Sequence, residues 1–278
     1  MRGQPTPSGL ARGLPGATRR GGAAAAPVFT PLDYSPLRAY HAPWDLDGSA
    51  PASVAARWQN SGIVDNDPVE TWTDWSDQEA HAQQGVGSKQ ARIRNAANGL
   101  HGTTPSYSFD GVDDAYNAQS LTVGATGLVV FFVGSPAAAV KFVYEHGANA
   151  STGPGSWMLG VQSGSTEFAV RYRRLTAFDA RRAQWADAAP HIAMQRFIPG
   201  DAGPHRFRVD DVDAVIASST SGTPTGAFTD TLYIGARLAG TIAPYLGLYT
   251  SLWVFDGLTD EQVTNVYNWL VDNTGFAP

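Results

Sequence analysis

The feature that most constrains the fold is the division of the chain, from Tyr107 onward, into short apolar segments separated by turn-forming residues. Turn sequences such as Asp110–Gly111, Pro199–Pro204 and Ser221–Gly226 reverse the chain between these segments. The pattern is typical of antiparallel β proteins, and 43% hydrophobic residues supply enough apolar surface for a large core. We expect strands over Ser106–Phe109, Ala115–Asn117, Gly127–Ser135, Lys141–His146, Ser156–Gln162, Glu167–Arg173, His191–Phe197, His205–Val209, Ala214–Ser218, Thr231–Ala236 and Leu246–Phe255.

In two of these segments, the pattern of apolar residues predicts which faces of the strand are buried. In "HRFRVDDVDAVI", Phe207 and Val209 alternate with Arg206 and Arg208, so one face of the strand is apolar and the other is charged. The segment "SLWVFDG" is almost entirely apolar, which predicts a strand that is covered on both faces.

One clear helix is predicted, near the C-terminal end of the chain. Thr259 is a suitable N-cap residue, and Gln262, three positions later, completes a capping box. Asp260 and Glu261 lie in the first turn, where the helix dipole favours acidic groups, and Gly275 ends the helix region. The apolar stripe of this helix comprises Val263, Val266, Tyr267 and Leu270. We expect it to pack outside a two-sheet antiparallel sandwich.

The first 30 residues differ from the rest of the chain. They are rich in Gly, Pro, Ala and Arg and have no hydrophobic periodicity, so they cannot form a core of their own. They are either a disordered tail or an extended arm that orders against a neighbouring subunit. We expect one β domain over residues 31–278, preceded by this arm over residues 1–30.

The charge of the chain is unevenly distributed. The net charge is −6, from 19 Lys and Arg against 25 Asp and Glu. Residues 1–30 carry +4 and no acid, which leaves −10 on the remainder, with 15 basic and 25 acidic residues. An acidic body of this kind repels nucleic acid, whereas a basic arm favours contact with something other than its own domain. The arginines of the arm are Arg2, Arg12, Arg19 and Arg20.

Other sequence features exclude several protein classes. The chain has no cysteine, which excludes disulfides and Cys-ligated metals. The most apolar run, Gly127–Val143, is interrupted by Gly134 and Pro136 and is shorter than the ~20 apolar residues that span a bilayer, so we expect no membrane insertion. The N-terminal residues lack an apolar segment, and we expect no signal peptide.

The order of several motifs resembles that of a known family. These motifs are "ETWTDWSDQEAHAQQ", "PSYSFDGVDDAYNA", "HRFRVDDVDAVIASS" and "TLYIGARLAGTIAPYLGLYTSLWVFDGLTDEQVTNVYNWL". Together they resemble the concanavalin A-like jelly roll, in particular the laminin-G-like domain of bacteriophage virion proteins, over roughly Thr71–Leu270. Asp211 stands where that family usually has glycine. The resemblance implies an all-β jelly-roll sandwich, but this fold supports lectins, glycanases and structural proteins alike.

The acidic residues do not match the catalytic pattern of glycan hydrolases. In the glycanases of the family that this chain resembles, the two carboxylates, about 5–5.5 Å apart for retaining chemistry, come from a Glu-x-Asp-x-x-Glu strand. None of the five glutamates has that spacing; they are Glu70, Glu79, Glu145, Glu167 and Glu261. The six histidines are scattered, and no G-x-S-x-G sequence or phosphate-binding loop occurs. We therefore expect no enzymatic activity and no required cofactor.

Calcium is the metal for which the sequence offers candidate ligands. Asp110, Asp113 and Asp114 surround a glycine in "YSFDGVDDAYNA", and calcium prefers oxygen ligands of this kind. The alternative is a tight turn, in which Asp binds its own backbone and Gly111 takes a positive φ. The segment lacks the D-x-D-x-D-G spacing of a dedicated calcium loop, which favours the turn.

Two groups of residues are candidates for ligand contact. Sugar binding requires exposed aromatic rings beside polar loops, and the candidates are Trp157, Tyr172, Trp185 and Tyr245. The alternative for each is a place in the core, since aromatic residues in strands are usually buried. The segment Arg171–His191 is interpreted as a basic loop, either solvated or in contact with an acidic partner or anionic glycan. Its arginines include Arg173, Arg174, Arg181 and Arg182.

Three functions are weighed on this basis. The preferred one is a non-enzymatic structural protein of a tailed-bacteriophage virion, as head decoration, head fibre or tail appendage. In that role the arm docks on other virion proteins, the sandwich faces outward, self-association into a homo-oligomer is expected, and a host-surface glycan is a further partner. The alternative is a carbohydrate-binding, lectin-like module of a surface or secreted protein. A glycan hydrolase is the least favoured.

Overall fold

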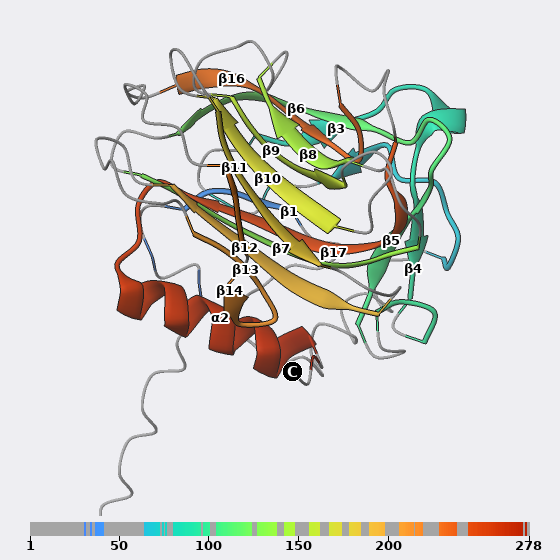
Figure 1. Ribbon diagram of the computed structural model, residues 1–278. Coiled ribbons are helices and arrows are strands. Elements are labelled where there is room, and N and C mark those ends of the chain that lie inside the picture. Colours follow the sequence, from blue (N-terminus) through green and yellow to red (C-terminus); the bar gives the residue numbers. More distant parts are fainter. Residues whose placement is uncertain are drawn as a thin grey trace, which may run out of the picture.

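The computed structural model consists of two antiparallel β-sheets and one C-terminal helix (Figure 1). This confirms the predicted all-β sandwich. The residues that the structure describes are 31, 34, 37–41, 64–72, 74, 76, 80–95, 97–100, 104–123, 127–137, 142–147, 156–161, 167–173, 178–184, 189–197, 206–213, 215–218, 228–237, 244–274 and 276. The predicted arm, residues 1–30, lies outside them, and the boundary of the domain stays a prediction.

The first sheet, sheet A, is built around its longest strand. Its strands are β1 (Leu37–His41), β4 (Arg92–Arg94), β5 (Ser106–Asp110), β7 (Leu128–Pro136), β12 (His191–Phe197), β13 (Arg206–Val209), β14 (Val212–Asp213) and β17 (Leu246–Phe255). Their order is β14-β13-β12-β7-β17-β5-β4, and all neighbours are antiparallel. One edge of β17 pairs with β7, while the other pairs first with β5 and then with β1.

The second sheet, sheet B, lies on the other side of the core. Its strands are β2 (Thr71–Trp72), β3 (Ala82–Gln83), β6 (Tyr116–Val123), β8 (Phe142–His146), β9 (Trp157–Val161), β10 (Glu167–Arg173), β11 (Phe178–Gln184), β15 (Val215–Ser218) and β16 (Phe228–Ile234). Their order is β15-β11-β10-β9-β8-β16-β6-β3-β2. Every strand that the sequence analysis expects is present, and β6 and β16 are longer than expected.

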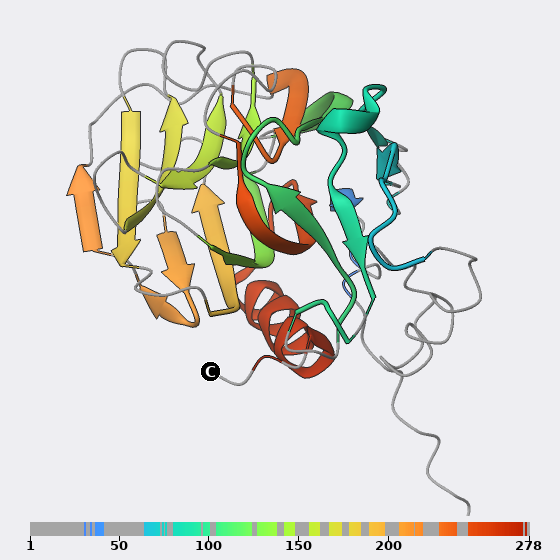
Figure 2. The same cartoon turned by 90° about the vertical axis from the view of Figure 1, so that its right-hand side faces the viewer.

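Buried apolar side chains form two clusters, one on each face of sheet A. Between the sheets, the indole of Trp72 stacks on Tyr107 with ring centroids 3.8 Å apart and meets Phe109 and Tyr249 edge-on. A second cluster joins the outer face of sheet A to the helix, where Trp253 meets Trp269 edge-on at 5.6 Å. The molecule therefore has three layers, sheet B, sheet A and the helix, and Figure 2 shows the helix on the far side of sheet A from sheet B.

The helix, α2 (Asp260–Thr274), begins as predicted. The backbone N–H of Thr259 donates to Gln262 Oε1 at 2.9 Å, and the N–H of Gln262 donates to Thr259 Oγ1 at 3.2 Å. These reciprocal bonds form the capping box and satisfy two N–H groups that the helix itself leaves free. Arg196 of β12 pairs with Asp260, and this contact fixes the first turn against sheet A.

The covering by α2 explains the apolar character of β17. Leu252 and Val254 point into the core between the sheets, whereas Trp253 and Phe255 point toward α2. The prediction of a strand covered on both faces is confirmed. No described helix is long and apolar enough to cross a membrane.

Candidate functional site

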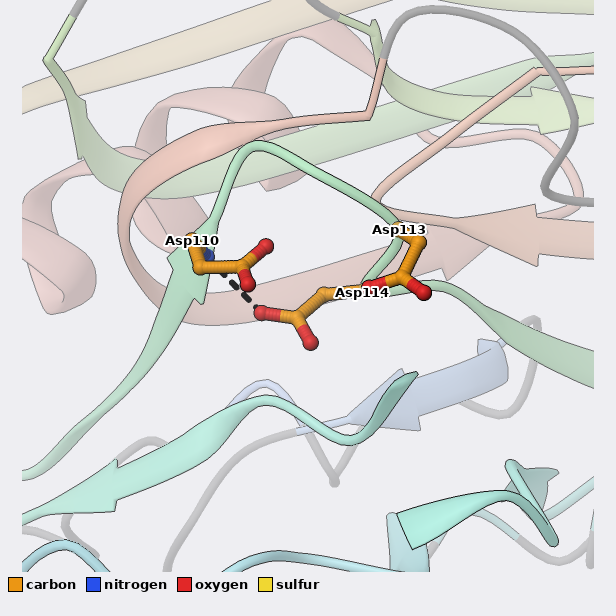
Figure 3. A group of neighbouring side chains, drawn as sticks. All are labelled: Asp110, Asp113 and Asp114. Carbon is orange, nitrogen blue, oxygen red and sulfur yellow. Dashed lines mark hydrogen bonds between the residues drawn. The ribbon is translucent and has the colours of Figure 1, made fainter. Parts of the chain in front are cut away.

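The three aspartates singled out in the sequence lie at the turn between β5 and β6 (Figure 3). Asp110 Oδ1 accepts the N–H of Val112 at 2.7 Å, and Asp114 Oδ2 accepts the N–H of Asp110 at 2.8 Å. Gly111 has φ 75°, a conformation that favours glycine, as the turn interpretation predicted. Two of the three carboxylates thus stabilise the turn itself.

The same turn brings the three carboxylates together. One oxygen from each of Asp110, Asp113 and Asp114 lies within 4.8 Å of the others. Asp114 is buried, and burial together with the neighbouring charges of Asp110 and Asp113 raises the pKa of its carboxyl group to about 6. The hydrogen bond from the Asp110 N–H opposes this shift. The turn therefore holds one carboxyl group that takes up a proton only slightly below neutral pH.

The donor set fits part of a calcium site. Asp110, Asp113 and Asp114 can each offer one carboxylate oxygen to a common point. Calcium takes six to eight oxygen ligands, so these three residues would supply only some of them. Calcium binding at Asp110, Asp113 and Asp114 stays a prediction.

The aromatic candidates for sugar binding are corrected by the structure. Trp157, Tyr172 and Tyr245 are all buried in the core between the sheets. Trp157 stacks on His146 and Tyr172 stacks on Phe197. A ring enclosed by protein cannot offer its face to a sugar, so the core alternative holds for these three residues. Trp185 lies outside the described residues.

The basic segment is also corrected. It was expected to be a loop, but β10 and β11 form an antiparallel hairpin pair within sheet B. Arg173 pairs with Phe178, Arg181 pairs with Val170 and Arg182 with Ala169. The backbone of this segment therefore belongs to the sheet. Arg174 and the arm residues Arg2, Arg12, Arg19 and Arg20 lie outside the described part of the chain.

An ion pair elsewhere in sheet B was not predicted from the sequence. Glu145 of β8 is completely buried, and its Oε1 accepts a hydrogen bond from Arg237 Nε at 3.1 Å. The guanidinium of Arg237 also lies 5.4 Å from the ring centroid of Phe142. The two residues are far apart in sequence, and no local pattern links them. Tyr144, the neighbour of Glu145 in β8, points into the core, so the Glu145 side chain lies on the outer side of sheet B. Its negative charge is neutralised there by Arg237.

Three histidines, His81, His146 and His191, have hydrogen-bond partners within the fold. His146 Nε2 bonds to the carbonyl of Leu121 at 2.9 Å, and His191 Nδ1 lies 2.5 Å from Asp210 Oδ2. His81 Nδ1 accepts the N–H of Asp74 at 3.0 Å. These contacts hold turns and strand ends together, and none of them forms a group of metal ligands among the described residues.

Comparison with known proteins shows that the fold of this chain is similar to that of solved structures. No family model matches the sequence, and no curated protein matches it either. The Trypanosoma rangeli sialidase in complex with sialic acid superposes with a TM-score of 0.52 at 13% identity, over 85% of this chain and 33% of the sialidase. Domain 4 of AbnA, a GH43 extracellular arabinanase from Geobacillus stearothermophilus, in complex with arabinotriose, superposes with a TM-score of 0.50 at 12% identity. That match covers 83% of this chain and 97% of the domain.

These likenesses establish a shared architecture only. The chain spans about a third of the length of the sialidase but almost the whole of the arabinanase domain. At such identities a common fold can carry different functions, so activity must be argued from the residues of this chain.

Proposed function

We propose that this chain is a carbohydrate-binding β-sandwich module without catalytic activity. The observation that carries the proposal is its similarity, over nearly the full length of the domain, to a domain captured with arabinotriose. The similarity to a sialidase captured with sialic acid supports the same class of ligand. A carbohydrate-binding module is thus favoured over the virion role.

Three of the described carboxylates are held by contacts within the fold. Glu145 is buried and paired with Arg237, and Asp110 and Asp114 each accept a backbone N–H of their own turn. A general acid or nucleophile must instead reach the glycosidic bond of a bound sugar. We propose that these groups stabilise the fold and leave bound glycans intact.

Binding and hydrolysis are tested on the same protein. The full chain is applied to a glycan array and titrated calorimetrically with arabinotriose and with sialic acid, once with calcium and once with a chelator. We expect saturable binding of at least one glycan and no new reducing ends after prolonged incubation. Absence of binding under both conditions contradicts the module, and release of sugars that is lost when two carboxylates are replaced contradicts the lack of catalysis.

The virion role is kept as a second proposal because of the charge of the first 30 residues, which carry four arginines and no acid. In this proposal the arm docks on a phage particle and the sandwich carries the glycan-binding face outward. A protein that begins at Pro27 is mixed with particles that lack the native chain. Normal incorporation of this truncated protein would contradict docking by the arm.

A further inference from the structure

The registers of sheet B align one row of residues across the sheet. Each residue of the row is the Cα partner of the next one, from β2 at one edge to β10. We call this the outer row, and it consists of Thr71, Gln83, Asn117, Tyr233, Glu145, Met158 and Arg171.

The outer row faces away from the core. Tyr116 and Ala118 are fully buried in the core on either side of Asn117, and Leu232 and Ile234 are buried on either side of Tyr233. Since successive side chains in a strand point to opposite faces, the row occupies the outer face of sheet B. The corresponding face of sheet A is covered by α2, so the two sheets differ in what they offer to a partner (Figure 1).

Four residues of the outer row, on β2, β3, β6 and β16, are uncharged and at least partly exposed. Thr71, Gln83 and Asn117 are exposed and Tyr233 is partly exposed, whereas Glu145 and Met158, farther along the row, are buried. A second pair on the same strands is also exposed, with Thr122 Oγ1 and Thr229 Oγ1 2.7 Å apart. The neutral patch is defined as Thr71, Gln83, Asn117, Thr122, Thr229 and Tyr233.

The chemistry of the neutral patch limits its partner. The patch carries hydroxyl, amide and phenol groups and no formal charge, although the whole chain has a net charge of −6. Nucleic acid and anionic ligands are bound by cationic side chains, which the patch lacks. Surfaces that bind proteins or membranes usually expose a larger apolar area than this patch does. Hydroxyl and amide groups around one aromatic ring instead suit an uncharged ligand with many hydroxyl groups.

The dimensions of the patch are those of a short oligosaccharide. Neighbouring strands lie ~4.8 Å apart, so the row from β2 to β16 presents its polar groups over roughly 15 Å. The next residue of the row after Tyr233 is the buried Glu145, and its ion pair with Arg237 neutralises the charge next to the ring. The strands keep the polar groups in fixed positions, so little ordering is required when a ligand binds.

We propose that the neutral patch binds an uncharged oligosaccharide, with one sugar ring against Tyr233 and hydroxyl groups bonded to Asn117 and Gln83. This inference rests on the proposed function and assigns its site and its ligand class. Between the two ligand types seen in the comparison structures, it favours the arabinotriose type over sialic acid.

The test compares four variants of the full chain by calorimetry, with arabinotriose and a panel of uncharged oligosaccharides as probes. Tyr233→Ala removes the ring, and Tyr233→Phe keeps it as a matched control. Asn117→Ala removes an amide from the patch, and Asn98→Ala removes an exposed asparagine elsewhere on the surface. Melting temperatures show whether each variant is folded.

We expect Tyr233→Ala and Asn117→Ala to weaken binding at least tenfold, and both controls to bind within about threefold of the unchanged protein. If the unchanged protein binds glycans and Tyr233→Ala and Asn117→Ala bind equally well, the site is wrong while the proposed function stands. Exclusive binding of sialic acid also contradicts the neutral patch. If the unchanged protein binds no glycan, the proposed function fails and the site fails with it.

Discussion

At the scale of single residues, His146 and Asp114 are buried groups whose pKa values move in opposite directions. His146 stacks on Trp157 between the sheets, and burial lowers the pKa of its imidazole from 6.5 to about 4. For Asp114, burial raises the pKa from 3.8 to about 6. Both groups change charge between pH 4 and 6.5, so each affects stability in that range.

The imidazole of His146 makes the fold less stable in acid. Between pH 6.5 and 4 the unfolded chain binds a proton at this residue while the folded chain does not, so the free energy of unfolding falls as pH falls. We expect His146→Phe to remove this loss, which is on the order of 3 kcal/mol. Denaturant titrations from pH 7 to 4 measure it. Phe228→Leu, which alters a ring beside His146, serves as control and is expected to lower stability equally at each pH.

Asp114 has the opposite effect. Its carboxyl group favours the folded state below pH 3.8, and this contribution is lost as pH rises through about 6. We expect Asp114→Asn, whose amide oxygen still accepts the Asp110 N–H, to raise the free energy of unfolding at pH 7 by about 1–3 kcal/mol. The gain should vanish near pH 4 in the same titrations. A loss of stability at pH 7 would show that the ionised carboxylate is required by the turn.

At this scale, the sequence predicted contacts between residues that are close together in the chain. Asp110, Asp113 and Asp114 are close in the chain, so a single turn brings them together as expected. Asn117 and Tyr233 are far apart in the chain and meet only through the register of β6 and β16. Alternation shows that each points outward, but it does not show which residues of other strands lie beside them.

At the scale of elements, α2 covers sheet A and depends on its capping box. Thr259→Ala removes the hydroxyl that accepts the Gln262 N–H, so we expect the free energy of unfolding to fall by about 1 kcal/mol. Denaturant unfolding at pH 7 measures this change. Thr264→Ala is a suitable control, because its hydroxyl bonds within the helix interior to the carbonyl of Asp260. An equal loss in both variants would contradict a specific role for the cap.

The strands that were predicted from the sequence and the strand that was not differ in their pattern of apolar residues. β7 and β17 are long apolar segments between clear turns, and they were predicted almost to the residue. β11 contains Asp179, Arg181 and Arg182 and has no apolar alternation, so it was interpreted as a loop. Its place is fixed by backbone pairing with β10 and β15 on either side, which a local pattern does not contain.

At the scale of the whole molecule, the first described strand leads to a prediction of where the domain begins. β1 pairs with β17, and Leu37 packs into the cluster beneath α2. Removal of residues 1–30 should therefore leave the melting temperature unchanged, whereas removal of residues 1–41 should lower it. Burial of one leucine contributes about 1.5–3 kcal/mol, which corresponds to a decrease of roughly 5 °C. Calorimetric melting of the two truncated proteins measures the difference, and equal melting temperatures would place the boundary after β1.

The pairing of β1 with β17 also has a consequence for the order of synthesis. β1 is the first described strand to leave the ribosome, and β17 is the last. Until β17 emerges, β7, β5 and β1 lack the strand with which all three pair. We therefore expect the cooperative fold to form only after β17 has been made. Stalled or truncated products of translation would keep unpaired strand edges, and we expect them to aggregate or to be degraded.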